Sequence, residues 1–291
     1  MGDRLRIVTI SDGSIEVEVL PDIGARLHRL RVFGHDLLRT PGDPSAHVRD
    51  PFRWGAYVRA PWCNRIAAAP TRVDGQVVNV PSNFADGTAI HGQVYAMAWQ
   101  MREDGTLWAQ GGGDGWPWRY ESTLSISILE AALTIELTLA NLAATPMPAG
   151  LGLHPWFRSP LDVRIDAPRV LPSNTTAGLG VEPVSGSLDL RTLHPMPSGL
   201  DAAWLDLGDP AVELRWPTLG VTGSLRAHSD AGLCIVAASP RALDAVAIEP
   251  QTHLPQGLRR FLEGAPMGLL GLVPQGTMRL RTELAFRRSE A

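Results

Sequence analysis

Residues 123–139 read TLSISILEAALTIELTL, and this stretch decides the fold class. Apolar and polar side chains alternate from residue 123 to 128 and again from residue 133 to 139. An alternation with a period of two predicts a β-strand that buries one face and exposes the other. Residues 129–132 must then form the turn between the two strands, although their residue types favour a turn only weakly.

The same alternation occurs near both ends of the chain, at residues 14–19 and 278–284. Residues 233–238 read LCIVAA, a continuous apolar run that predicts a strand buried on both faces. Helical periodicity is limited to residues 259–263, which fit one short turn of helix. The 29 glycines and 24 prolines are spread along the chain as turn residues. We therefore predict an all-β protein, a large antiparallel β-sandwich forming a single domain over residues 1–291, with a concave groove for a ligand.

Composition and charge exclude several classes of protein. Apolar residues make up 44% of the 291 residues and charged residues 19%, so the chain can bury a full core. The net charge of −4 argues against a nucleic-acid partner, because such domains carry a dense basic face. All 26 basic residues are arginine, which excludes a Schiff-base lysine and a phosphate-binding loop of the Gly-Lys type.

The cysteine, histidine and hydropathy patterns predict the cellular compartment and whether a metal or cofactor is expected. Cys63 and Cys234 lie far apart, which fits neither a disulfide framework nor a four-ligand zinc site. No two histidines have the spacing of a metal motif, so we expect no metal and no cofactor. The N-terminal residues lack the apolar run of a secretion signal, and no stretch approaches the roughly 20 apolar residues of a membrane helix. We expect a cytoplasmic protein without a membrane partner.

Two of the eight histidines have a distinctive context, whereas most of them are expected at the surface or in turns. His91 precedes Gly92, which lets a backbone segment or a ligand approach closely. His154 precedes Pro155, which favours an extended conformation, and is followed by two aromatic residues. For each histidine alone, a buried ring bonded to the backbone is the simpler interpretation.

Three charged residues are candidates for chemistry or binding. Glu249 ends an apolar run before Pro250, where burial raises the pKa of a carboxyl group and suits a general base. The alternative is an edge charge that discourages strand pairing. Arg65 could bind two hydroxyl groups or fix a carboxylate, or it is an ordinary surface arginine. Asp201 could accept hydrogen bonds from a polyol, or it caps a turn.

Tryptophan is unusually frequent, with nine residues in the chain. Six lie beside glycine, proline or loop residues, where an aromatic face can stack on the C–H face of a sugar ring. The alternative is a place in the core, which we prefer for Trp99 and Trp108. The six are Trp54, Trp62, Trp116, Trp118, Trp156 and Trp204.

Taken together, the motifs resemble the aldose 1-epimerase (galactose mutarotase) family over nearly the whole chain. Each fragment alone is weak, but eight of them occur in the order of the family. They are LPDIGA at 20–25, PWCNRI at 61–66, IHG at 90–92, GWPW at 115–118, MPAGLGLHPWF at 147–157, GLD at 199–201, IEPQT at 248–252 and LVPQG at 272–276.

The resemblance implies a galactose mutarotase-like supersandwich that interconverts the α and β anomers of a monosaccharide without a metal. By motif, Glu249 matches the general base of the family and His154 its general acid. These two groups are expected to face each other across a gap the size of a pyranose ring. The positions that match substrate-binding residues of the family are Arg65, Asn64, His91 and Asp201.

Departures from the family pattern leave the sugar open. Trp156 stands where many members carry tyrosine, and Arg158 could favour an anionic sugar. One alternative is therefore a hexose-6-phosphate 1-epimerase relative, which needs an arginine cluster drawn from Arg59, Arg65 and Arg158. Another is a non-catalytic sugar-binding or sensing domain on the same fold. The sequence specifies neither the sugar, the pathway nor the oligomeric state.

Overall fold

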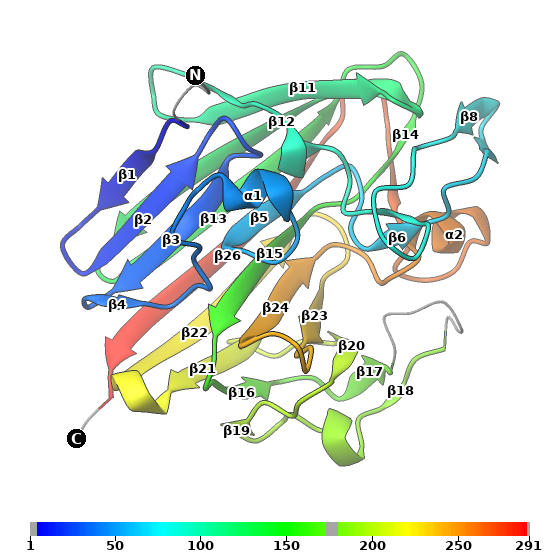
Figure 1. Ribbon diagram of the computed structural model, residues 1–291. Coiled ribbons are helices and arrows are strands. Elements are labelled where there is room, and N and C mark those ends of the chain that lie inside the picture. Colours follow the sequence, from blue (N-terminus) through cyan, green and yellow to red (C-terminus); the bar gives the residue numbers. More distant parts are fainter. Residues whose placement is uncertain (1–4, 173–179, 290–291) are drawn as a thin grey trace.

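Two large antiparallel sheets form the body of the protein (Figure 1). One hydrophobic core joins them. The computed structural model describes residues 5–172 and 180–289. Within these residues the first sheet has 11 strands, in the order β1 (Val8–Ser11), β2 (Ile15–Leu20), β3 (Arg26–Val32), β5 (Ala56–Arg59), β15 (Gly152–Arg158), β24 (Ala245–Gln251), β23 (Cys234–Ala238), β20 (Asp201–Leu205), β17 (Arg169–Leu171) and β18 (Glu182–Pro183), with β4 (His35–Asp36) paired to β3. The described part of the second sheet has nine, in the order β10 (Gln100–Met101), β11 (Leu107–Gly113), β12 (Trp116–Leu129), β13 (Ala132–Asn141), β26 (Thr277–Arg288), β22 (Val221–Ser229), β21 (Val212–Trp216), β16 (Asp162–Ile165) and β19 (His194–Pro195).

Smaller elements connect and cover these sheets. The two-stranded sheets are β6 (Arg65–Ile66) with β9 (Ala89–Ile90), β7 (Thr71–Val73) with β8 (Gln76–Val78), and β14 (Met147–Ala149) with β25 (Leu270–Leu272). The helices are α1 (Ala46–Arg49) and α2 (Gly257–Leu262), with 3₁₀ turns η1 (Val94–Ala96), η2 (Gly186–Leu188) and η3 (Pro217–Leu219). Among the described residues, none of the helices has the length and apolar character needed to cross a membrane.

The alternating stretch at residues 123–139 forms the hairpin of β12 and β13, as predicted. Leu124 pairs with Leu137, and both are buried in the core, while the serines and threonines between them face outward. The turn falls at Glu130 and Ala131, whose φ angles are 50° and 59°. Two residues with positive φ match the right-handed twist of the strands, so this turn closes the hairpin without glycine.

The first sheet is covered on both faces. Leu153 and Ile248 belong to the core shared with the second sheet, and both have less than 4% of their surface exposed. Loop residues such as Phe52 pack on the opposite face, against Tyr57 and Trp156. The apolar run at residues 233–238 provides β23, a strand buried on both faces as predicted. Functional side chains on this sheet must therefore project under the covering loops.

The division of the tryptophans between the core and the surface differs from the one expected from the sequence. Trp108 is only half-buried and lies beneath Arg102, whose guanidinium is 5.7 Å from the ring centre, so its assignment to the core is wrong. Its neighbours Leu107 and Ala109 take the inward positions of β11, and alternation leaves Trp108 on the outer face. Of the six tryptophans beside loops, four are core residues at 2% exposure or less, namely Trp62, Trp116, Trp118 and Trp204.

Candidate active site

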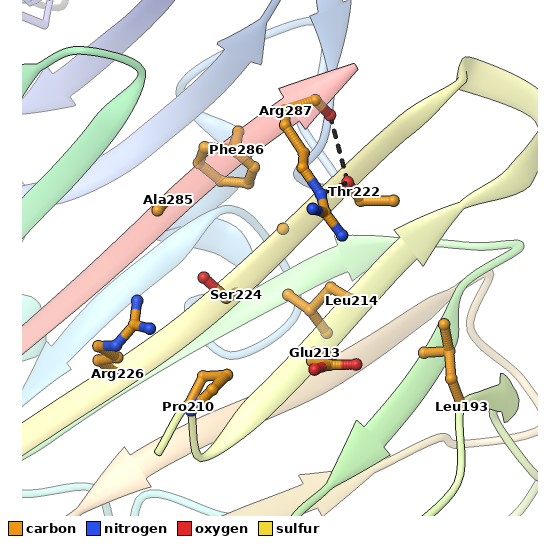
Figure 2. Close-up of a pocket in the computed structure, with 11 residues that line it drawn as sticks. Leu193, Pro210, Glu213, Leu214, Thr222, Ser224, Arg226, Ala285, Phe286 and Arg287 are labelled. Carbon is orange, nitrogen blue, oxygen red and sulfur yellow. Dashed lines mark hydrogen bonds between the residues drawn. The ribbon is translucent and has the colours of Figure 1, made fainter. Parts of the chain in front are cut away.

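A cavity of about 310 Å³ lies over β21, β22 and β26 of the second sheet (Figure 2). Its wall includes a 3.4 Å hydrogen bond from Thr222 Oγ1 to the backbone oxygen of Arg287. The described lining contains one carboxylate, that of Glu213, and no histidine. This cavity therefore lacks the carboxylate and imidazole pair that acid–base chemistry uses most often.

A second cavity, of about 240 Å³, lies on the loop-covered face of the first sheet. Phe52, Phe84 and Trp156 contribute aromatic surface to it. All six residues singled out from the sequence line this one cavity, although they come from distant parts of the chain. They are Asn64, Arg65, His91, His154, Asp201 and Glu249.

Strand register brings His154 and Glu249 together. Gly152 pairs with Gln251, and Trp156 pairs with Ala247, on the neighbouring strands β15 and β24. The same register places His154 directly opposite Glu249. Because their neighbours Leu153 and Ile248 point into the core, alternation turns both polar side chains toward the cavity.

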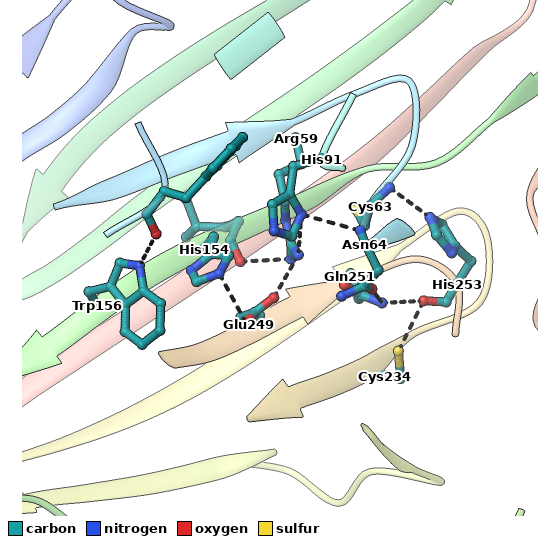
Figure 3. A network of polar contacts seen from close by, with 12 residues as sticks. Arg59, Cys63, Asn64, His91, His154, Trp156, Cys234, Glu249, Gln251 and His253 are labelled. Atoms are coloured by element: carbon teal, nitrogen blue, oxygen red, sulfur yellow. Dashed lines mark hydrogen bonds and ion pairs between the residues drawn. The ribbon is translucent and has the colours of Figure 1, made fainter. Parts of the chain in front are cut away.

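The imidazole and the carboxylate are in direct contact (Figure 3). His154 Nε2 lies 3.2 Å from Glu249 Oε1, and both residues are at least 95% buried. The expectation that a ring-sized gap separates the two groups is therefore wrong, because adjacent strands set their side chains side by side. Glu249 also lies inside β24 between two neighbouring strands, so it is neither at a strand end nor an edge charge.

Arg59, which the sequence suggested only as part of a phosphate-binding cluster, lies beneath the cavity. Its Nη1 is 2.6 Å from Glu249 Oε2, and its Nη2 donates a 3.1 Å hydrogen bond to the backbone oxygen of Leu153. Room for the guanidinium comes from Gly152, the cross-strand partner of Arg59 on β15. A Cβ at Gly152 would lie 2.7 Å from Arg59 Nη2.

The charges around Glu249 have opposing effects on its pKa. Burial raises the pKa of this carboxyl group to about 7, and the Asp201 carboxylate adds to the increase. The Arg59 and Arg65 guanidinium groups act in the opposite direction, because a nearby cation stabilises the ionised carboxylate. A carboxyl group that titrates near neutrality can both accept and return a proton at pH 7.

Burial lowers the pKa of His154 well below its ordinary value, and the Arg59 cation adds to this effect. The Tyr57 ring stacks on the imidazole, with ring centres 4.6 Å apart and an interplanar angle of 25°. The Trp156 ring centre is 5.0 Å from that of His154, at an interplanar angle of 44°. His154 thus packs against two aromatic rings, with its Nε2 directed at Glu249.

His91 is held by donors at one ring nitrogen. The backbone N–H of Asn64 lies 3.2 Å from His91 Nδ1, and Arg59 Nη1 lies 3.4 Å from the same atom. Nδ1 accepts both, so the neutral ring carries its hydrogen on Nε2. Burial, reinforced by Arg59, lowers the pKa of His91 well below its ordinary value and keeps the ring neutral. Gly92 permits this placement, since a Cβ there would lie 2.0 Å from the backbone oxygen of Ala60.

Asn64 lies on the covering loop, and Arg65 begins the short strand β6 that follows it. Gln251 Nε2 donates a 2.7 Å hydrogen bond to Asn64 Oδ1, which fixes the amide at the cavity wall (Figure 3). Arg65 Nε is 2.5 Å from Asp86 Oδ2, and its guanidinium lies 5.1 Å from the Phe84 ring centre. Arg65 therefore borders the cavity as one member of an ion pair.

Among the described residues, no group of three or more histidine, cysteine or acidic side chains is placed to hold a metal ion. Cys63 and Cys234 are both buried free thiols. The polar groups that converge on the cavity are thus the imidazoles, carboxylates, amide and guanidinium described above. This set can bind hydroxyl groups and move protons between oxygen atoms.

Comparison with known proteins agrees with the resemblance. The sequence pattern of the aldose 1-epimerase family matches residues 6–211, which leaves Glu249 outside the matched part. YihR of Escherichia coli K12, an uncharacterised protein, is 32% identical over 107 residues, which cover 34% of this chain and 35% of YihR. The match thus spans about a third of that curated relative.

Solved structures show the same fold. A candidate aldose 1-epimerase from Escherichia coli K12 has a TM-score of 0.82 at 19% identity, covering 98% of this chain and 99% of that one. Galactose 1-epimerase from Lactobacillus acidophilus NCFM has a TM-score of 0.78 at 16% identity, covering 98% and 95%. The predicted all-β, galactose mutarotase-like fold is therefore confirmed, and the chain belongs to the aldose 1-epimerase family.

Proposed function

We propose that this protein is an aldose 1-epimerase that interconverts the anomers of a free, neutral monosaccharide in the cytoplasm. The observation that carries the proposal is the 3.2 Å contact between His154 Nε2 and Glu249 Oε1 inside the cavity. The anomeric oxygen and the ring oxygen of an aldose are bonded to the same carbon. An acid and a base that serve these two oxygens must therefore lie side by side, as this pair does.

The reaction needs one proton held by the pair. In the resting site that proton lies on Glu249, since its pKa is raised to about 7 while that of His154 is lowered. Transfer across the contact gives an ionised Glu249 and a charged His154. This is the arrangement in which the carboxylate acts as base and the imidazolium acts as acid.

Ring opening then follows in one concerted step. Glu249 removes the proton from the anomeric hydroxyl group, and the electrons of that O–H bond form the carbonyl of the open-chain aldehyde. The bond between C1 and the ring oxygen breaks, its electron pair stays on the ring oxygen, and His154 protonates that oxygen. Rotation about C1–C2 presents the other face of the carbonyl, and closure reverses both proton transfers.

The other residues of the cavity would bind the sugar. Asp201 and Asn64 can accept hydrogen bonds from hydroxyl groups, and Arg65 and the Nε2–H of His91 can donate them. The volume of about 240 Å³ is below the roughly 300–1,000 Å³ of pockets for drug-sized ligands, which suits a single sugar ring.

A phosphorylated sugar fits this cavity less well. Arg59 contacts the carboxylate of Glu249, and Arg65 contacts that of Asp86. Arg53 also lines the cavity, 3.8 Å from the carboxylate of Asp50, whereas Arg158 is not part of the lining. These ion pairs favour a neutral aldose over a hexose 6-phosphate. A purely sugar-binding role is disfavoured as well, because binding alone needs no acid in contact with a base.

Polarimetry of freshly dissolved α-galactose, α-glucose and α-glucose 6-phosphate tests the proposal, with the spontaneous rate subtracted. We expect faster equilibration of the neutral sugars and a smaller effect on the phosphate. A preference for the phosphate would favour the hexose-6-phosphate alternative. Binding of the neutral sugars without any acceleration would identify a sensing domain instead.

A further inference from the structure

Arg59 is fully buried and does not line the cavity, yet it contacts two of the residues that do. A single nitrogen, Nη1, lies 2.6 Å from Glu249 Oε2 and 3.4 Å from His91 Nδ1. These contacts leave Glu249 Oε1 to face His154, and they leave Nε2 of His91 as the hydrogen-bearing nitrogen. One cation thus sets the orientation of both side chains.

The surrounding strands are built to hold this guanidinium. Arg59 and Gly152 are cross-strand partners, and the missing side chain of Gly152 leaves the space that the guanidinium occupies. A Cβ there would also lie 2.6 Å from Cys63 Sγ, so the space is closed on both sides. Nη2 is anchored to the backbone oxygen of Leu153 at 3.1 Å.

We propose that Arg59 is a positioning residue, which fixes Glu249 and His91 from beneath the cavity and supports the acid–base pair without touching the sugar. This inference rests on the proposed function for its kinetic consequences, but the electrostatic effect exists in the sugar-free protein. A cation at hydrogen-bond distance stabilises the ionised form of a carboxylate, and it typically lowers the pKa of that group by about 1–3. Arg59 therefore counteracts the burial of Glu249.

Other charged and titratable groups also act on Glu249 from the elements packed around it. His154 on β15 contacts its Oε1, and Tyr57 on β5 lies on the far side of that imidazole. Asp201 on β20 acts to raise the pKa of Glu249, and Arg65 on β6 acts to lower it. Among these groups, only Arg59 contacts Oε2 in the described structure, so its removal should have a distinct effect on the titration.

Carbon-13 NMR of protein labelled at the glutamate carboxyl carbon measures this effect without substrate. The resonance of Glu249 is assigned by its absence in Glu249→Gln. In the wild type we expect a midpoint near pH 7, and in Arg59→Gln a midpoint at least about one pH unit higher. Arg59→Lys retains the charge and should shift the midpoint less. An unchanged midpoint in Arg59→Gln would overturn the inference.

The pH dependence of anomer conversion provides the kinetic test. Catalysis requires the proton shared by the pair, so the rate should fall above about pH 7 in the wild type, and this alkaline limb should move upward in Arg59→Gln. KM should stay within about threefold, because Arg59 does not line the cavity and the backbone N–H of Asn64 still holds His91 Nδ1. An equal loss of rate at every pH would show a merely structural role, and a tenfold rise in KM would show a sugar contact.

Two further variants keep the test decisive if Arg59→Gln does not fold. Gly152→Ala displaces the guanidinium without altering any ionisable group, and it should raise the midpoint in the same direction. Arg72→Gln, at an exposed position on β7, is the matched control and should change neither midpoint nor profile. If the wild type shows no anomer conversion, the proposed function fails while the NMR titration still decides the role of Arg59.

Discussion

At the scale of single residues, Trp156 links the cavity wall to its covering loop. Its Nε1 donates a 2.6 Å hydrogen bond to the backbone oxygen of Phe52, and its ring packs beside His154. The residue is 94% buried, and it lines the cavity. The indole therefore both orders Phe52 and offers an aromatic face to a sugar ring.

Trp156→Ala should raise KM by about tenfold, because losing an aromatic contact surface costs on the order of 1–2 kcal/mol. Trp156→Phe keeps a ring but loses the bond to Phe52, so its KM should rise less. Initial rates of anomer conversion over a range of sugar concentrations measure both effects. A KM that is unchanged in Trp156→Ala would place the sugar away from this wall.

The candidate site residues were predictable from sequence one by one, but their contacts were not. His154 and Glu249 are 95 positions apart, and nothing in either segment specifies which strand becomes the neighbour of which. Arg59 was missed as a partner of Glu249, although an arginine within the apolar run of residues 56–60 is itself a signal. Charged side chains in such runs are rarely buried without a partner of opposite charge.

At the scale of secondary-structure elements, the β12–β13 hairpin is closed by a turn of unfavourable composition. Glu130 and Ala131 both adopt positive φ, at 50° and 59°. This conformation brings Cβ close to the backbone and costs roughly 1–2 kcal/mol for a residue other than glycine. The hairpin tolerates that cost because ten residue pairs hold β12 and β13 together.

Ala131→Gly should stabilise the protein by up to about 1 kcal/mol, because glycine relieves the strain, although its greater flexibility when unfolded offsets part of the gain. The melting temperature should rise by roughly 2 °C, as measured by calorimetry. Gly113→Ala, at φ 79° in the same sheet, is the opposite control and should lower it. A lower melting temperature for Ala131→Gly would contradict the strain argument.

The strands themselves were largely predictable, since alternation marks β2, β12, β13 and β26 and a continuous apolar run marks β23. The order of the strands within the sheet was not predictable, because β15 lies between β5 and β24, and both of these strands are far from it in sequence. Such pairings depend on long-range packing rather than on local residue preference. The single domain over residues 1–291 remains a prediction.

At the scale of the whole molecule, histidine burial exceeds the expectation of mostly surface positions. Five of the eight histidines are at least 95% buried, namely His28, His47, His91, His154 and His253. Burial, together with Arg26 and His28, lowers the pKa of His47 to about 3, and burial lowers that of His253 to about 4. The folded protein therefore holds these rings neutral.

Stability should accordingly fall in mild acid. The unfolded chain protonates each histidine near pH 6.5, so the contribution of a neutral histidine is present above that pH and is lost as the pH falls toward 4 or 3. His47 and His253 should each contribute on the order of 3–5 kcal/mol. Glu249 has the opposite effect on stability. Because its pKa is raised in the folded state, Glu249 stabilises the folded protein below pH 4.5, and this contribution is lost as the pH rises through about 7.

Urea denaturation at pH 5 and pH 7.5 measures the net effect of the histidines and Glu249 on the free energy of unfolding. We expect a clearly lower free energy of unfolding at pH 5, because several buried histidines outweigh the single carboxyl group. His47→Gln should reduce the difference between the two values. Equal stability at both pH values would mean that the folded protein accommodates charged histidines.

The most direct measurement of the central claim is the polarimetric rate of wild type, Glu249→Gln and His154→Gln under the same conditions. If the touching carboxylate and imidazole perform the two proton transfers, each variant should lose about 10²–10⁴-fold of the enzymatic rate while remaining folded. A folded Glu249→Gln or His154→Gln that converts anomers at a near-wild-type rate would contradict the account.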